Sequence, residues 1–137
     1  RRLKQRNDLK LVIVDYMQLM SSGKRVESRQ LEVSEFSRQM KLLAKELEVP
    51  VVALSQLNRG PEQRTDKKPM LSDLRESGSL EQDADMVILL HRDDMYNNSS
   101  DRTGEADLIV AKHRNGQTKT VTVAFQGHYS RFVDMQH

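Results

Sequence analysis

The sequence contains no cysteine and no tryptophan, and aromatic residues make up only 4% of its 137 positions. Without cysteine there is no disulfide framework and no zinc site built from thiolates, and this absence fits a cytoplasmic protein. The chain also lacks any apolar run near the roughly 20 residues that a membrane-spanning helix needs. These absences argue against a disulfide-stabilised secreted scaffold and against a membrane-spanning protein.

The charges of the chain nearly balance, with 22 Lys and Arg against 20 Asp and Glu, which leaves a formal net charge of +2. So small a net charge gives no overall attraction to nucleic acid, so any such contact has to come from a local cluster. The length corresponds to one domain or part of one. The four histidines show no spacing typical of a metal site, which argues against zinc: His91, His113, His128 and His137.

Two short apolar runs end at polar residues. Residues 11–14 (LVIV) are followed by Asp15, and residues 51–54 (VVAL) are followed by Ser55 and Gln56. A run that is apolar at every position predicts a strand buried on both faces, as in a parallel sheet covered by helices. Since ligands bind at the carboxyl ends of such strands, Asp15 and Gln56 stand where chemistry is expected.

A helix is predicted from about residue 30 to residue 47, after a polar loop at 21–29. The residue before a proline avoids the α region, so the helix is expected to end before Pro50. Its apolar residues recur at three- to five-residue spacing and predict one buried stripe: Leu31, Phe36, Met40, Leu43, Ala44 and Leu47.

The rest of the chain alternates loops, turns and strands. A basic loop at 58–69 precedes two short capped turns within 72–85, and residues 86–90 form a third apolar strand, predicted parallel to the others. Residues 91–104 are polar and predict an exposed, mobile loop.

The C-terminal part reads as antiparallel β structure. Asn115-Gly116 lies between two strand-like runs and is a strong hairpin signal. Gly127-His128 offers a second turn, and alternation along 120–125 predicts a strand with one buried face. The predicted fold class is α/β, a mostly parallel sheet with flanking helices and a C-terminal antiparallel hairpin or meander.

Asp15 and Gln56 each allow two interpretations. An acid after an apolar strand is the pattern that holds Mg²⁺ through water in P-loop NTPases, although a turn or cap residue is the commoner explanation. The chain has no GxxxxGK[ST] motif, and Tyr16 stands where many such ATPases place a glutamate. Gln56 can donate to a γ-phosphate oxygen and accept from a water, or it can simply end its strand.

Two basic segments are candidates for phosphate contacts. Arg75 and the backbone near Gly78 follow the basic loop and can contact a nucleic-acid backbone, against the commoner reading of a solvated charged loop. Lys112 and Arg114, two residues apart before the hairpin turn, can reach a phosphate on another subunit as an arginine finger does. A charged edge strand is the more frequent explanation of such a pair.

Four segments together resemble the bacterial DnaB-type replicative helicases. They are LVIVDYMQLM at 11–20, LSQLNR at 54–59, SDLRESGSLEQDAD at 72–85 and KHRNG at 112–116. The resemblance covers essentially the whole chain in order. The 72–85 segment is its most specific part, and it argues against a recombinase or a helicase loader.

The resemblance implies a RecA-like ATPase domain in a homo-hexameric ring that translocates on single-stranded DNA. By motif, Asp15 matches the Mg²⁺-associated Walker B acid, and Gln56 matches the residue that couples nucleotide to DNA. Arg75, Glu76 and Gly78 match the loop along the DNA backbone. Lys112 and Arg114 match the pair that reaches the neighbouring subunit's nucleotide, with Arg114 as the finger.

In that family the P-loop, the catalytic glutamate and an amino-terminal domain all precede the segment that corresponds to this chain. Residues 1–137 are therefore expected to be a partial RecA-like domain, from the Walker B strand onward, inactive as an isolated piece. The implied ligands are ATP, Mg²⁺ and single-stranded DNA, and the implied partners are primase and a helicase loader in a cytoplasmic primosome. The alternative is a non-catalytic RecA-like module for protein or single-stranded-DNA binding.

Overall fold

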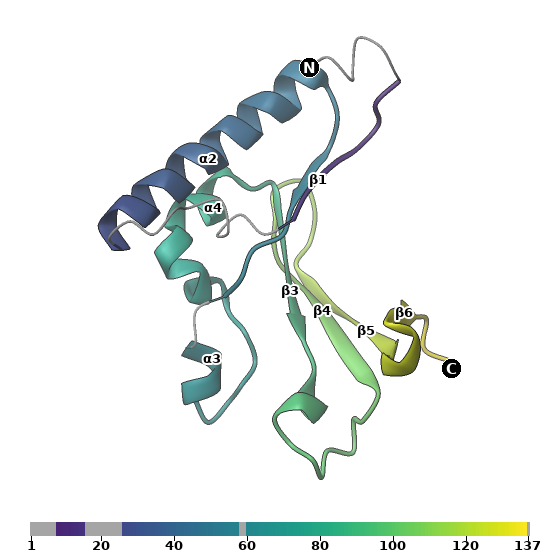
Figure 1. Cartoon of the computed structure of the whole chain (residues 1–137). Helices are drawn as coiled ribbons and strands as arrows, with labels where there is room; N and C mark the ends of the chain where they lie inside the picture. The colour runs from purple at the N-terminus through teal and green to yellow at the C-terminus, as the bar shows by residue number, and fades with distance from the viewer. Residues whose placement is uncertain (1–7, 16–25, 58–59, 137) are drawn as a thin grey trace. The chain divides into compact units, whose positions relative to one another are not determined.

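The computed structural model describes residues 8–15, 26–57 and 60–136, and it divides the chain into two compact units. The first unit comprises residues 1–58 and 74–84, and the second comprises residues 59–73 and 85–137. Each unit has its own sheet (Figure 1). Within the described ranges, no helix is both long and apolar enough to cross a membrane.

The first unit is built on a parallel strand pair. β1 (Val12–Val14) pairs with β2 (Val51–Ala53), and the 22-residue helix α2 (Val26–Leu47) lies between them in sequence. Parallel neighbours need such a crossover, because a tight turn can only join antiparallel strands. The short helix α4 (Gly78–Asp83) packs on α2. The predicted parallel pair and crossover helix are confirmed.

The end of α2 explains why the chain turns into β2. Glu48 has a φ of 53°, and the Val49 N–H donates to the Ala44 carbonyl over 3.3 Å. This is the six-to-one bond that closes a helix through a left-handed residue, here a glutamate in place of the usual glycine. Pro50 follows and cannot continue the helix, as predicted.

The buried face of α2 differs from the predicted stripe. The helix begins at Val26, four residues before the predicted start, because Glu, Ser and Arg are acceptable in a helical turn. Val33 and Ser37 are buried on the packed face, whereas Leu31 is 72% exposed. Leu31 was wrongly assigned to the stripe: it lies two residues from Val33, and residues two apart do not share a helix face.

The prediction that the parallel strands are buried on both faces is wrong for the described residues. Ile13 and Val52 are register partners on one face of the pair, and both are exposed. The described residues of the first unit leave that face uncovered. An apolar run reports which side chains tolerate burial, and it does not say that both sides of the pair are buried.

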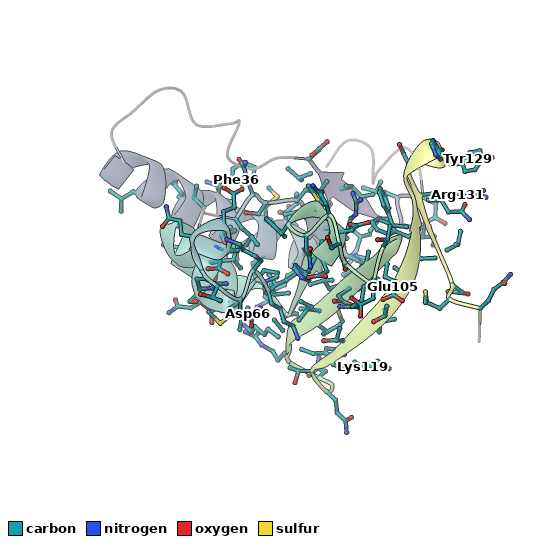
Figure 2. All side chains as sticks on the ribbon, turned by 90° about the horizontal axis from the view of Figure 1, so that it is seen from below. Phe36, Asp66, Glu105, Lys119, Tyr129 and Arg131 are labelled. Atoms are coloured by element: carbon teal, nitrogen blue, oxygen red, sulfur yellow. The ribbon has the colours of Figure 1, made fainter. Side chains whose placement is uncertain are left out.

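The second unit is a four-stranded antiparallel meander in the order β3-β4-β5-β6. It contains β3 (Met86–His91), β4 (Glu105–His113), β5 (Lys119–Gln126) and β6 (Arg131–Val133). The hairpin around Asn115-Gly116 and the second turn, a 3-10 helix η4 (Gly127–Tyr129), are confirmed. At this turn Arg131 lies over the Tyr129 ring, 4.9 Å from its centroid, as the neighbouring sticks in Figure 2 show.

The pairing of β3 also differs from the prediction. It pairs antiparallel with β4, and no pairing with β1 or β2 occurs in the part of the chain that the structure describes. Leu89 is 4% exposed while its neighbours Ile88 and Leu90 are exposed, so only one face of this all-apolar strand is buried. A run without polar residues hides the two-residue period that separates the faces.

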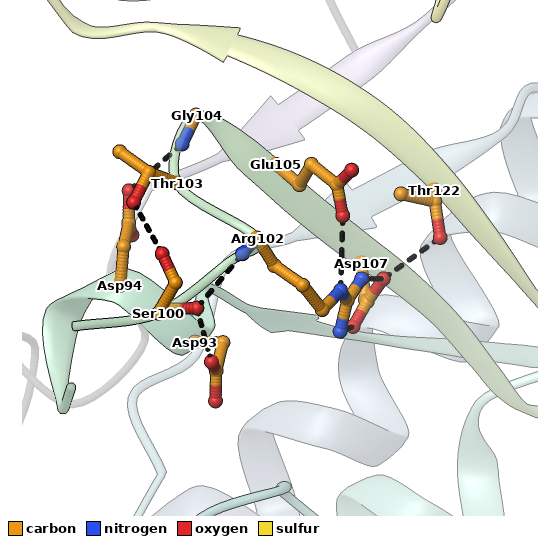
Figure 3. A network of polar contacts seen from close by, with 9 residues as sticks. All are labelled: Asp93, Asp94, Ser100, Arg102, Thr103, Gly104, Glu105, Asp107 and Thr122. Atoms are coloured by element: carbon orange, nitrogen blue, oxygen red, sulfur yellow. Dashed lines mark hydrogen bonds and ion pairs between the residues drawn. The ribbon is translucent and has the colours of Figure 1, made fainter.

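A polar network organises the connection between β3 and β4 (Figure 3). The Arg102 guanidinium donates to both carboxylate oxygens of Asp107, over 2.7 and 3.0 Å, and to Glu105 over 2.9 Å. The Thr122 hydroxyl donates to Asp107 over 2.9 Å. Residues 97–99 are exposed, as predicted for this loop, but Ser100 is buried and its hydroxyl donates to Asp93. Side-chain bonds therefore anchor both ends of a segment whose polarity suggested only solvent.

The same network shifts the pKa of two carboxyl groups. The Arg102 hydrogen bonds, aided by Thr122, lower the pKa of the Asp107 carboxyl below its ordinary value, although burial opposes this. The Gly104 N–H donates to Asp94 over 3.1 Å, and this bond lowers the pKa of the Asp94 carboxyl. Both acids are thus held in the charged form that their partners require.

Asp107→Asn is expected to reduce the free energy of unfolding at pH 7 by about 1–3 kcal/mol, because Arg102 loses one of its two anionic partners and keeps only Glu105. A folded-state pKa below the unfolded value of about 3.9 means that this contribution is complete above that pH. It is lost as the pH falls through the lowered folded pKa. Denaturant unfolding at neutral and acidic pH measures the difference, with exposed Asp101→Asn as the control. A difference that is the same at every pH would contradict the assignment.

Candidate functional site

Asp15 and Gln56 emerge from the same edge of the parallel pair. Val14 is the register partner of Ala53, and the Leu54 N–H donates to the Val14 carbonyl over 2.8 Å, which extends the pairing past both strands. Asp15 follows β1 directly, and Gln56 lies three residues beyond β2; both are exposed. The carboxyl-edge position predicted for both residues is therefore observed. Tyr16 lies outside the described residues.

Asp15 is the carboxylate that the described residues of this edge offer to a cation. Among the residues that the structure describes, no group of three or more His, Cys, Asp or Glu side chains is arranged to hold a metal ion. A single exposed carboxylate such as Asp15 fits Mg²⁺, which keeps several waters and takes its other ligands from phosphate oxygens. The edge is thus compatible with a nucleotide-borne magnesium ion.

The segment around Arg75 is helical. η2 (Leu71–Ser77), a 3-10 helix, contains Arg75 and Glu76, and Gly78 opens α4. Two short helical turns were predicted within residues 72–85, and both are present. The side chains of residues 75–79 lie outside the description, so the predicted DNA contact of Arg75, Glu76 and Gly78 stays a prediction.

A buried carboxylate, that of Asp73, holds the residues that precede Arg75 in the chain. Asp73 is 4% exposed and accepts from the Arg64 guanidinium over 2.7 and 3.1 Å and from the Met70 N–H over 2.7 Å. The bond to Asp73 raises the pKa of the Arg64 guanidinium above its ordinary value. Arg64 also donates to the Lys68 carbonyl over 2.7 Å. Arg64 therefore links its own segment to Asp73 through hydrogen bonds and is not a solvated cation of a basic loop.

The far end of the segment is tied separately, within the first unit. The Ser37 hydroxyl of α2 donates to Asp83, the last residue of α4, over 2.8 Å. Ser37 itself is buried. This bond fixes α4 on α2 and so holds the carboxyl end of the segment that begins at Arg75.

Arg114 lies one residue beyond β4, where the β3–β4 ladder ends. Met86 is the register partner of His113, and the Arg114 N–H donates to the Asp85 carbonyl over 2.8 Å, which continues the ladder by one step. The Arg114 Nη1 atom lies 3.2 Å from Asp85 Oδ1, and both side chains are at least half exposed. Lys112 lies within β4, opposite Val87.

The turn after Arg114 is held by a hydrogen bond between residues of the turn itself. The Gly116 N–H donates to the His113 carbonyl over 3.3 Å. A Cβ atom on Gly116 would overlap the His113 imidazole, so any other residue here would displace this ring. The backbone on both sides of Arg114 is therefore fixed by short-range contacts.

Comparison with known proteins decides the family. Residues 1–134 match the DnaB-like helicase C terminal domain family. The chain belongs to this family. It is 80% identical over 135 residues to the replicative DNA helicase DnaB of Mycobacterium intracellulare, and 78% identical to that of Leifsonia xyli subsp. xyli.

Solved structures share the fold of this DnaB-family chain. One of them, described as an ATPase domain, matches with a TM-score of 0.91 and 48% identity, covering 99% of this chain and 49% of that one. A DnaB-like replicative helicase, whose structure describes its interactions with primase, gives the same TM-score and identity over 33% of its length. The predicted RecA-like α/β fold class is confirmed. The chain spans 23% and 30% of the two curated relatives named above.

Sequence reasoning missed three residues of this DnaB-family segment: Arg64, Asp73 and Asp85. The pairing of Arg64 with Asp73 spans nine residues without a helical or strand period, so no local pattern reveals it. The register of β3 on β4 would have revealed Asp85 beside Arg114, had the antiparallel pairing been predicted.

Proposed function

We propose that this chain is part of a replicative DNA helicase that couples ATP hydrolysis to translocation on single-stranded DNA and to duplex unwinding. The observation that carries the proposal is the 78–80% identity to proteins named replicative DNA helicase along nearly the whole chain. In this proposal residues 1–137 form the part of a RecA-like ATPase domain that starts at the Walker B strand. The P-loop belongs to the remainder of the full-length protein.

A chimera tests this function directly. The chain replaces the matching 135-residue segment of the Leifsonia xyli helicase, and the product is called the helicase chimera below. It is expected to hydrolyse ATP in a DNA-stimulated manner and to unwind a forked duplex. A chimera that forms rings and binds DNA without hydrolysis would instead support the non-catalytic module.

Asp15 and Gln56 would act at the nucleotide. Their common position at the carboxyl edge of β1 and β2 supports this role, since ligands bind at such edges. Asp15 would hold Mg²⁺ through water, and the ion would neutralise charge on the β- and γ-phosphates. The Gln56 amide would donate to a γ-phosphate oxygen and so sense whether that phosphate is present.

Lys112 and Arg114 would act across a subunit boundary in a homo-hexamer, with Arg114 as the finger. The exposure of Arg114 at the end of the ladder supports this role, because a side chain that reaches another subunit has to be accessible. Single-stranded DNA would run along Arg75, Glu76 and Gly78. Primase is a proposed partner because a structural relative is described with primase; a loader and a cytoplasmic primosome complete the proposal.

Arg75→Ala in the helicase chimera is expected to weaken single-stranded DNA binding about equally for all base compositions. The segment offers no aromatic side chain to stack a base, so a phosphate contact is the readout that its sequence supports. Losing one such contact lowers the salt slope of log K by roughly 0.7. Basal ATPase should largely survive while its stimulation by DNA falls.

Salt titrations with homopolymer and mixed-sequence oligonucleotides measure this slope. Lys45→Ala, which removes one exposed positive charge from the last turn of α2, is the matched control. A wild-type slope and affinity, or a defect confined to one base, would show that Arg75 does not follow the backbone.

A further inference from the structure

Asp85 forms a two-point contact with the proposed finger residue. Its carbonyl accepts from the Arg114 N–H over 2.8 Å, and its carboxylate lies 3.2 Å from Arg114 Nη1. The first contact holds the backbone at Arg114 opposite Asp85, and the second places a carboxylate oxygen beside one nitrogen of the guanidinium. We propose that Asp85 is a positioning residue that holds the Arg114 guanidinium ready for a phosphate of the neighbouring subunit, an inference that rests on the proposed function of Arg114.

The geometry of the sheet makes Asp85 suitable for this task. Asp85 directly precedes β3 and Arg114 directly follows β4, and the last ladder pair, Met86 with His113, places them opposite each other. After Arg114 in the chain, the Gly116 N–H donates to the His113 carbonyl, and the Gly116 Cα lies against the His113 ring. A long arginine side chain on a fixed backbone still has freedom about its own bonds, and a carboxylate beside it reduces that freedom.

The chemistry of the guanidinium allows it to serve two anions. It carries five N–H donors in a planar fork, and one carboxylate uses at most two of them. An arginine oriented by Asp85 can therefore present its remaining edge to a phosphate without first leaving its partner. Because both side chains are at least half exposed, the pair adds little to the stability of the fold. The expected benefit of the pair is therefore in catalysis.

The experiment is a double-mutant cycle in the helicase chimera. Asp85→Asn is expected to lower kcat for ATP by about 10- to 100-fold with little change in KM, since misplacing a catalytic group by about 1 Å costs up to this much. Asp85→Glu, which keeps the charge on a longer side chain, should restore part of kcat. In an Arg114→Ala background, Asp85→Asn should have no further effect, because the group that it positions is gone.

Thermal unfolding separates positioning from folding, because Asp85→Asn is expected to leave the unfolding temperature unchanged. The control is Asp101→Asn, at an exposed aspartate in the β3–β4 connection, which is expected to leave kcat unchanged. An unchanged kcat in Asp85→Asn would overturn the inference, and so would an increase, which would make Asp85 a restraint. An equal fold-loss with and without Arg114 would overturn it too. If Arg114→Ala alone leaves kcat unchanged, the proposed finger role itself fails, and the cycle distinguishes that result from the others.

Discussion

Arg114→Ala in the helicase chimera is expected to lower kcat for ATP by about 10³- to 10⁵-fold, the range that arginine fingers contribute. Nucleotide affinity should change much less, because a finger acts mainly on the charge that develops in the transition state. Steady-state ATPase assays give kcat, and binding of a fluorescent nucleotide gives affinity. Arg131→Ala, at a solvent-exposed arginine of β6, is the matched control.

A parallel loss of nucleotide binding and turnover would contradict the finger assignment for Arg114. It would indicate that the guanidinium holds the ground state, as a residue of the subunit's own phosphate site would. Arg131→Ala should leave both quantities near wild type. If Arg131→Ala were equally damaging, the effect would reflect the general charge of the second unit.

The isolated chain is expected to show no ATP hydrolysis, with or without single-stranded DNA. Nothing in the 137 residues matches the sequence of a P-loop, the motif whose backbone amides and lysine hold the β- and γ-phosphates. Phosphate release by the purified chain, compared with a protein-free blank, measures this. The helicase chimera at equal concentration is the positive control. Steady, DNA-stimulated hydrolysis by the chain alone would show that its phosphate site has been misread.

Local patterns predicted those parts of the fold that local chemistry determines. The helix α2 ends at Leu47, three residues before Pro50, and Asn115-Gly116 marks the hairpin; both features follow from the backbone preferences of a few residues. The placement of Asp15 and Gln56 followed from the general rule that parallel strands present their carboxyl ends together. These features need no knowledge of distant partners.

The predictions were wrong where contacts between residues distant in the sequence determine strand pairing and burial. An all-apolar strand has no visible period, so β3 was assigned to the parallel set although it pairs antiparallel with β4. Residues 91–104 were predicted to be an exposed loop, yet Arg102 of this segment binds Asp107 of β4, which is almost fully buried. The Asp85–Arg114 contact depends on the register of two strands and is invisible until that register is known. Residue roles came from motif resemblance, and they stay proposals.

The central claim is that Arg114 of one subunit completes the nucleotide site of its neighbour. Mixing two inactive helicase chimeras tests it most directly: one carries Arg114→Ala, and the other has an intact Arg114 but a disabled P-loop lysine in the host's own part. If Arg114 acts in trans, mixed rings contain interfaces where an intact phosphate site meets an intact finger, so ATPase activity returns on mixing. If Arg114 serves its own subunit's nucleotide, no mixed interface is complete and activity stays absent at every ratio, which would contradict the account.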